Sequence, residues 1–273
     1  MRSALVLFVI LSCAKAYNTT QDILHAAQIQ CTKHKHYTCY YDNEILVLEW
    51  KSDRPKNVLW NFNEHARELI TGELALHMIH LIPKLNPSKR ITMVPIMNVW
   101  GRTTAMDSNP CQRKNKNNVD PNRNFWTPTN HRKYRKSSEE YEGRTPISQP
   151  ESILLDKLLT NTKRYVNVHS GESSIYMPHD GSYSKVKNYK TMHETIHKYA
   201  KHCPECTVGP AAVKSFYRAY GTSVDWAIEK GVPEAYTFEI FGRETSNCFK
   251  MFNPDDMTKT LEKWEKILLL TIN

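Results

Sequence analysis

Short apolar segments alternate with longer segments of helical periodicity along most of the chain. Buried strands are expected over residues 45–50, 58–62, 91–97, 165–168 and 234–240. Helices are expected over residues 69–85, 151–163, 189–201 and 223–230, and a last helix places Leu261, Trp264, Ile267 and Leu268 on one face. This alternation predicts an α/β fold, with a single three-layer domain and a twisted, mixed, largely parallel sheet flanked by helices.

Prolines and one long polar segment interrupt this pattern. Pro95 predicts that the strand over 91–97 lies at a sheet edge or carries a bulge, and Pro83 is expected to disrupt the end of its helix. Residues 100–143 are rich in Asn, Pro, Arg and Lys and show little periodicity, so an irregular loop is expected there. Such a long loop in a compact domain usually carries function.

Residues 1–16 have the features of a secretory signal peptide. Arg2 precedes an apolar run over residues 4–12, and Ala14-Lys15-Ala16 offers a small-residue cleavage site. The alternative is a membrane anchor, but a spanning helix needs about 20 apolar residues. We therefore expect a domain of residues 17–273, without a membrane span, that is secreted or sent to a vacuole-like or lysosome-like compartment.

Removal of that segment leaves six cysteines, an even number that favours disulfide bonds on the secretory route. Cys203-Pro204-Glu205-Cys206 also resembles half of a zinc ribbon, but the chain has no second motif of this spacing. Sequence alone does not choose among the pairings; our preferred set is Cys31–Cys39, Cys203–Cys206 and Cys111–Cys248.

The composition narrows the class of protein further. Apolar residues make up 40% of the 273 residues and charged residues 24%, which excludes a disordered chain and a multi-pass membrane protein. The formal charge is +9, and basic clusters at residues 114–118 and 131–136 allow a polyanion-binding protein as an alternative. No base-stacking motif or groove-binding helix accompanies these clusters, so we expect no nucleic-acid partner.

Histidine and carboxylate residues follow three of the predicted strands. His65 and Glu68 come after residues 58–62, His169 after 165–168, and Glu239 lies near the end of the strand over 234–240. The carboxyl ends of parallel strands meet at one sheet edge. Two His and one Glu leave the fourth position of a catalytic zinc ion open for water, and a further carboxylate can take a proton from that water.

Five blocks of sequence resemble the zinc carboxypeptidases of the carboxypeptidase A type. The blocks are NEHARE at 63–68, RKN at 113–115 with VDPNRNF at 119–125, YVNVHSG at 165–171, YRAYGTSVDW at 217–226 and YTFE at 236–239. The resemblance implies an enzyme with one Zn²⁺ per chain that acts on the C-termini of peptides or proteins and removes one residue at a time.

The resemblance also implies a role for each matching residue. His65, Glu68 and His169 would bind zinc, and Glu239 would activate the attacking water and pass its proton to the leaving amine. Arg113 would polarise the scissile carbonyl and stabilise the oxyanion. The remaining roles concern the substrate: Asn122 and Arg123 would hold its terminal carboxylate, Tyr217 would close over it, and Arg67 and Ser170 would line the cleft further along the peptide.

Val224 matches the family position at the base of the pocket for the departing side chain. Val carries no charge, which favours an apolar or aromatic terminal residue, and Phe216, Ala212, Ala219 and Thr237 match other uncharged pocket positions. The alternative is that Val224 packs within a helix and another residue controls the pocket.

Two further expectations concern regulation and activity. Only 48 residues separate Ala16 from His65, so we expect no inhibitory prosegment and control by pH, by compartment or by a separate protein inhibitor. We also expect a monomer. A catalytically inactive relative that serves as a binding protein is the alternative. Such relatives usually lose a metal ligand or the base, and this chain retains all four residues.

Overall fold

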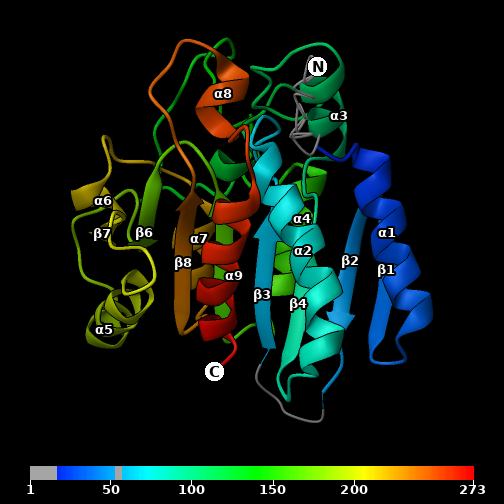
Figure 1. The fold of residues 1–273 in the computed structure, drawn as a ribbon. Helices are drawn as coiled ribbons and strands as arrows, with labels where there is room; N and C mark the ends of the chain where they lie inside the picture. Colours follow the sequence, from blue (N-terminus) through cyan, green and yellow to red (C-terminus); the bar gives the residue numbers. More distant parts are fainter. Residues whose placement is uncertain (1–16, 53–56) are drawn as a thin grey trace, which may run out of the picture.

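The computed structural model describes residues 17–52 and 57–273, so the expected signal peptide lies outside the described residues. A single eight-stranded sheet forms the centre (Figure 1), in the order β1-β2-β4-β3-β5-β8-β6-β7. Its strands are β1 Tyr37–Asp42, β2 Ile45–Trp50, β3 Asn57–Phe62, β4 Arg90–Val94, β5 Arg164–His169, β6 Ser173–Met177, β7 Thr207–Pro210 and β8 Glu234–Ile240.

Helices cover both faces of this sheet. They are α1 Thr20–Lys33, α2 Leu69–Leu85, α3 Val99–Asp107, α4 Pro150–Leu159, α5 Tyr189–Ala200, α6 Ala211–Lys214, α7 Ser223–Glu229, α8 Cys248–Phe252 and α9 Thr258–Thr271, with a 3₁₀ turn η1 at Pro121–Arg123. One hydrophobic core joins α1, α2, α5 and α9 to the sheet, and a second joins α4 and α7 to its other face. Figure 1 shows α2 and α9 in front of the strands and α7 behind them.

The alternating side chains of the strands explain this arrangement. In β3, Val58, Trp60 and Phe62 enter the first core, whereas Leu59 between them enters the second. Successive side chains of a strand point to opposite faces, so a strand that is covered on both faces is apolar throughout. The pairs β3–β4, β3–β5, β5–β8 and β6–β7 are parallel, and the remaining three are antiparallel. The expected mixed, largely parallel α/β fold is confirmed.

Several local predictions need correction. Strand β4, which was expected at a sheet edge or with a bulge because of Pro95, lies inside the sheet, between β2 and β3. It ends at Val94, so Pro95 follows the last paired residue and does not interrupt the ladder. The helix expected to reach residue 163 ends at Leu159, and four residues separate it from β5. Pro83 lies within the last turn of α2, which ends at Leu85 with Asn86 in the left-handed region. Proline is tolerated there because only part of a turn follows it.

The segment expected to be irregular contains helix α3. Asn98 caps this helix by accepting a hydrogen bond at its side-chain oxygen from the backbone N–H of Gly101, at 2.9 Å. Asn is a strong N-cap residue, because its side chain satisfies an N–H that has no partner within the helix. The rest of residues 108–143 has no regular element except η1 and an isolated bridge.

The structure contains the preferred set of disulfides, Cys31–Cys39, Cys111–Cys248 and Cys203–Cys206. The second bond joins residues 137 positions apart and connects the long loop to helix α8. Within the described residues no helix is both long and apolar enough to span a bilayer.

Removal of the Cys111–Cys248 bond should lower the free energy of unfolding more than removal of Cys31–Cys39. The longer loop restricts the unfolded chain more, and a loss of about 2–4 kcal/mol is typical of such a bond. Denaturant unfolding of Cys111→Ala/Cys248→Ala, with Cys31→Ala/Cys39→Ala as the matched control, measures the difference. Equal losses in both variants would contradict this expectation.

Candidate active site

Three parallel strands at the centre of the sheet bring the candidate residues together. In the ladder Phe62 lies opposite Val168, and His169 lies opposite Glu239, so β3, β5 and β8 end at the same edge. His65 and Glu68 lie in the turn that follows β3, and Glu68 is the N-cap residue of α2. Residues far apart in the sequence therefore meet at one edge of the sheet, as the strand predictions indicated.

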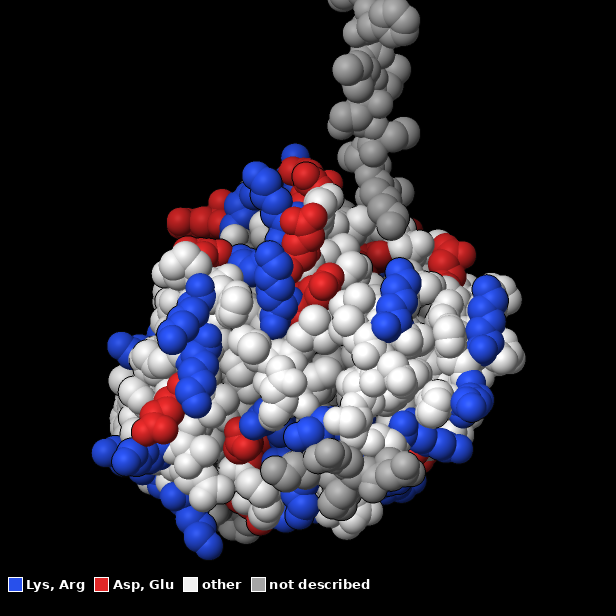
Figure 2. Space-filling model, turned by 60° about the horizontal axis from the view of Figure 1, so that its bottom comes forward, with Lys and Arg blue, Asp and Glu red and all other residues white. Residues whose placement is uncertain are grey.

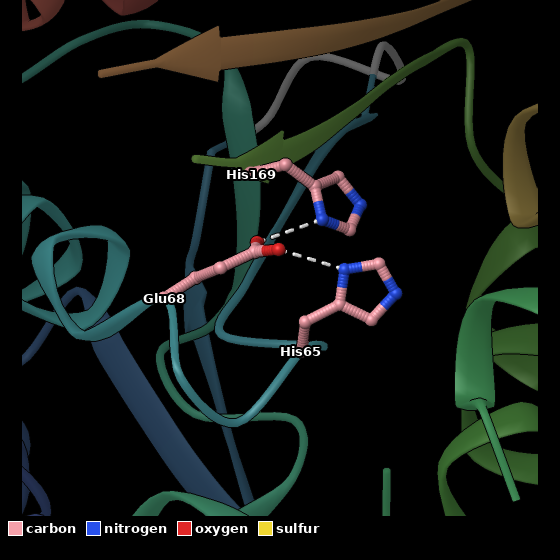
Figure 3. Close-up of side chains that lie close together, drawn as sticks. All are labelled: His65, Glu68 and His169. Atoms are coloured by element: carbon pink, nitrogen blue, oxygen red, sulfur yellow. Dashed lines mark hydrogen bonds and ion pairs between the residues drawn. The ribbon is translucent and has the colours of Figure 1, made fainter. Parts of the chain in front are cut away.

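The side chains of His65, Glu68 and His169 converge on one point (Figure 3). The two oxygens of Glu68 lie 2.8 Å from Nδ1 of His65 and 2.9 Å from Nδ1 of His169. All three residues are buried, and one ligand atom from each lies within 4.8 Å of the others. Two imidazole nitrogens and one carboxylate form a donor set that fits zinc and leaves a coordination position free.

The turn between β3 and α2 is held by a buried arginine that the sequence did not reveal. Arg102, on α3, donates from Nη1 to Oδ1 of Asn63 at 2.7 Å and to the carbonyl of Leu69. Asn63 has a φ of 51° and donates from Nδ2 to the carbonyl of His65 at 2.9 Å. Asn tolerates this left-handed conformation better than most residues. Helix α3 thus fixes the backbone that presents His65.

Asp120 connects the predicted metal ligands to Arg113. Its Oδ1 lies 3.1 Å from Nε2 of His65, and its Oδ2 accepts from Nε and Nη2 of Arg113 at 2.9 and 2.7 Å. A carboxylate on the far nitrogen of a histidine fixes the tautomer and orients the ring toward a metal. Asp120 belongs to the block at residues 119–125, but the sequence analysis gave it no role, because its contacts appear only in the folded chain.

Charge pairing dominates the ionisation of these buried groups. Burial raises the pKa of the Asp120 carboxyl, but Arg113 and His65 outweigh it and hold that pKa well below its usual value. Burial likewise opposes ionisation of Glu68, and His65 and His169 lower its pKa nonetheless. An opposite charge within a few ångströms favours the charged form. Glu68 and Asp120 are therefore carboxylates at neutral pH.

Glu239 has a different environment from Glu68. Burial raises its pKa to about 8, and His169 opposes this shift. Its Oε2 has no hydrogen-bond partner among the described residues, and the side chain lines the same cavity as the histidines. Glu239 is held apart from the predicted ligands and has one oxygen without a partner, and a pKa near neutrality suits it to exchange a proton with a group bound in the cavity.

The cavity at this edge has a volume of about 250 Å³. All but one of the site residues predicted from the sequence line it: His65, Arg67, Glu68, Arg113, Asn122, Arg123, His169, Ser170, Tyr217 and Glu239. The exception is Val224, which is only 1% exposed and packs in the second core with α4. Among the expected uncharged pocket residues, Phe216, Ala219 and Thr237 line the cavity, and Ala211 lines it in place of Ala212.

Arg123 is buried at one side of this cavity. Its Nη1 donates to the carbonyl of Asn122 and its Nη2 to the hydroxyl of Tyr217 at 3.0 Å, whereas Nε has no partner among the described residues. The side chain of Asn122 contacts Nε2 of His169 at 3.3 Å and accepts from the backbone N–H of Ser223. Asn122 therefore joins the predicted carboxylate-binding segment to the metal-ligand set.

Arg67 and Ser170 lie further along the cavity. Arg67 pairs with both oxygens of Glu139 at 2.9 and 3.0 Å, and its guanidinium lies 4.3 Å from the ring centroid of Phe252. The backbone N–H of Ser170 donates to Glu68, and its hydroxyl has no partner within the described part of the chain. Asp180, also in the lining, was not predicted from the sequence.

A buried His-Glu-His set beside a separate carboxylate, at the carboxyl ends of parallel strands, is an arrangement typical of metallohydrolases. The sequence profile of one family, zinc carboxypeptidase, matches residues 21–266. The chain belongs to this family, as the sequence blocks predicted.

The individual relatives share little sequence identity with this chain. Carboxypeptidase B of Rattus norvegicus is 26% identical over 237 residues, which cover 80% of this chain and 54% of that protein. Carboxypeptidase B2 of the same species is 28% identical, over 73% of this chain and 55% of the relative. The chain thus spans about half the length of these curated relatives.

Solved structures of the family share the fold. Carboxypeptidase A from Helicoverpa armigera superposes with a TM-score of 0.83 at 20% identity, over 94% of this chain and 73% of that one. Bovine thrombin-activatable fibrinolysis inhibitor, in complex with tick carboxypeptidase inhibitor, superposes with a TM-score of 0.80 at 21% identity. The superposition covers 96% of this chain and 97% of that chain.

Substitution of His169 should remove bound zinc. Loss of one of three ligands leaves too few donors to hold the ion against a chelating buffer. His169→Ala should therefore contain almost no zinc by elemental analysis, whereas His197→Ala, which alters an exposed histidine of α5, should retain it. Equal zinc content in the two variants would refute the assigned ligand.

Proposed function

We propose that the protein is a zinc-dependent carboxypeptidase, an exopeptidase that hydrolyses the last peptide bond of peptides or proteins. The observation that carries this proposal is a shared cavity that contains the His65-Glu68-His169 set, the unpartnered oxygen of Glu239 and the buried guanidinium of Arg123. The first two supply the means of hydrolysis, and the third recognises a chain end.

Glu239 acts as the general base in this proposal. A zinc ion held by His65, Glu68 and His169 would supply Lewis-acid chemistry, polarising the carbonyl and lowering the pKa of water. Oε2 of Glu239 takes a proton from the attacking water and then delivers it to the nitrogen of the leaving residue, which departs as an amine. Glu239 lines the cavity and its Oε2 has no partner among the described residues, which supports this role.

Recognition of the free carboxylate is assigned to Arg123, with Asn122 and Tyr217 beside it. A guanidinium presents a planar fork of donors that matches a carboxylate, and a charge-assisted hydrogen bond of this kind is among the strongest in proteins. Arg123 is 2% exposed, so its charge is poorly screened by water. A free chain end carries the carboxylate that this guanidinium can bind, and a mid-chain segment does not.

Arg113 is positioned to stabilise the negative charge that develops on the carbonyl oxygen. Its Nε and Nη2 are bound by Asp120, which orients the guanidinium beside the predicted metal ligands. A donor that is fixed in place before the reaction costs no reorganisation when charge develops. Arg67 and Ser170 then contact the residues that precede the scissile bond.

The further parts of this proposal are secretion, a monomeric chain and control by a separate protein inhibitor. The preference for an apolar or aromatic terminal residue stays a prediction: Val224 packs in the second core, and the uncharged residues Phe216, Ala219 and Thr237 line the cavity. The site is complete within one chain, which supports a monomer.

The polyanion-binding alternative has weaker support. Lys114, in the first basic cluster, is buried and donates to the carbonyls of Lys136 and Ser138, so it serves the loop. On the face that Figure 2 shows, Lys and Arg are spread among uncharged and acidic residues without a continuous basic surface. The inactive-relative alternative is opposed by the intact set of ligands and base.

Replacement of Glu239 with Gln should abolish turnover without removing zinc. Gln keeps the shape of the side chain but cannot accept the proton, and a positioned base typically contributes about 10²–10⁴-fold to the rate. Release of the terminal amino acid from blocked dipeptides, with and without chelator, measures the activity, and elemental analysis measures zinc. A zinc-loaded Glu239→Gln variant with near-normal kcat would refute the assigned base.

Replacement of Arg123 with Ala should lower kcat/KM for peptides with a free C-terminus by roughly 10- to 100-fold, the range of a lost charge-assisted hydrogen bond. Arg123→Lys should rescue only part of this loss, because an ammonium lacks the planar fork. Arg132→Ala, which removes an exposed arginine from the same loop, is the matched control. Similar kcat/KM for the Arg123→Ala and Arg132→Ala variants would contradict the assignment.

A further inference from the structure

Glu64 is a buried carboxyl group beside the predicted metal ligands to which the proposed reaction assigns no role. It comes directly before His65 in the turn after β3, is 1% exposed and is not part of the cavity lining. Asn167 donates from Nδ2 to its Oε2 at 2.6 Å, and its Oε1 has no hydrogen-bond partner among the described residues. A buried carboxyl group with so few donors is costly, which favours a specific role for it.

The orientation of the two histidines shows where such a role lies. Their Nδ1 atoms face Glu68, at 2.8 Å for His65 and 2.9 Å for His169, so Nδ1 is the nitrogen of each ring that is placed to bind zinc. A neutral imidazole that binds a metal through Nδ1 carries its proton on Nε2, and that N–H requires an acceptor. Asp120 supplies the acceptor for His65, with its Oδ1 at 3.1 Å from Nε2.

Two groups lie near the corresponding nitrogen of His169. Nδ2 of Asn122 is 3.3 Å from Nε2, and Oε2 of Glu64 is 3.6 Å from it. The backbone N–H of Ser223 donates to Oδ1 of Asn122 at 2.9 Å, which turns the NH₂ group of this amide toward the ring. An NH₂ group donates and cannot accept, so of these two groups only Glu64 can take the proton of Nε2 in a hydrogen bond.

The accepting oxygen of Glu64 is held in place from β5. Asn167 precedes His169 by two residues on this strand, so both side chains point to the same face of the sheet. Its Nδ2 is shared between Oε2 of Glu64 at 2.6 Å and Oγ of Ser223 at 2.9 Å. A carboxylate oxygen has two lone pairs, so Oε2 can accept from Asn167 and from His169 together.

We propose that Glu64 is a positioning residue, which accepts the Nε2 proton of His169 and thereby fixes the tautomer and the direction of this metal ligand. The inference rests on the proposed function, because it takes the His-Glu-His set to hold zinc. We expect the distance of 3.6 Å to shorten once Nε2 carries the proton. A carboxylate on the far nitrogen also makes a histidine a more basic ligand. Each histidine of the set then has its own carboxylate, Asp120 for His65 and Glu64 for His169.

The test measures zinc affinity by competition with a fluorescent chelator, in the absence of a peptide. Glu64→Leu keeps a similar volume but offers no acceptor, and loss of such an outer partner typically lowers metal affinity by about 10- to 100-fold. Glu64→Gln keeps an oxygen that can accept but loses the charge. Its affinity for zinc should therefore lie between those of the wild type and Glu64→Leu.

Glu151→Leu and Glu151→Gln are the matched controls. Glu151 is also buried, at 8% exposed, but it accepts from Nδ2 of Asn115 and bonds to none of the predicted metal ligands in the described part of the chain. Thermal unfolding of the metal-free proteins reports any loss of the fold. Equal zinc affinity in Glu64→Leu and Glu151→Leu would overturn the role of Glu64. If Glu64→Leu does not fold, zinc affinity of Glu64→Gln as high as that of Glu151→Gln would do the same.

Nitrogen-15 NMR of the histidine side chains gives a second readout, which a merely structural role would not move. In the zinc-loaded wild type, His169 should carry its proton on Nε2, with slow exchange against water. In Glu64→Leu this proton should exchange faster, whereas the Nε2 proton of His65, which Asp120 holds, should not change. Unchanged exchange at His169 in this variant would contradict the inference.

The proposed function and this inference fail in different ways. If the zinc-loaded wild type cleaves no peptide, the proposed function fails, and weaker zinc binding by Glu64→Leu still supports the role of Glu64. If peptides are cleaved while the Glu64 variants bind zinc as tightly as the wild type, the peptidase stands and the inference is overturned. A wild-type chain that binds no zinc would overturn both.

Discussion

Five polar groups, four of them buried, form a continuous chain of contacts on which the site depends. Arg113 bonds to Asp120, Asp120 to His65, His65 to Glu68 and Glu68 to His169, with every contact between 2.7 and 3.1 Å. Removing one member of such a chain leaves its neighbour buried without a partner, which is far more costly than losing an exposed ion pair. Each side chain is therefore held by the next, and the geometry of the predicted metal ligands is coupled to that of the predicted oxyanion donor.

The proposed metal ligands and base could be located from the sequence because they lie next to strong signals of secondary structure. The segments that precede His65 and His169 are short apolar runs bounded by polar residues, and such runs identify buried strands without knowledge of their partners. Parallel strands of one sheet then require that their carboxyl ends meet. The order of residues along the chain was therefore enough to predict that these side chains lie at one edge of the sheet. The observed pairing of His169 with Glu239 agrees with that prediction.

Other features could not be predicted, because they depend on contacts between segments that carry no local pattern. Arg102 lies in a stretch with little apolar periodicity, yet it is fully buried and fixes Asn63. Val224 resembles a pocket residue by position, but the turn of α7 directs it into the core, so its side chain packs with α4 and Phe125. Asp180 follows a short strand, β6, that was not predicted from the sequence, and its proximity to the catalytic groups arises only when β6 pairs with β8.

The cavity is electrostatically asymmetric, and this asymmetry bears on how a chain end is bound. Arg123 contributes positive charge where the terminal carboxylate is proposed to bind, and Arg113 lies beside the predicted metal ligands. Asp180 lies in the same cavity wall, and burial and the charge of Asp225 raise its pKa to about 7. Burial strengthens each of these interactions, because few waters remain to screen them. A terminal carboxylate is therefore attracted to Arg123 and repelled by the acidic groups elsewhere in the wall, and this difference orients a chain end within the cavity.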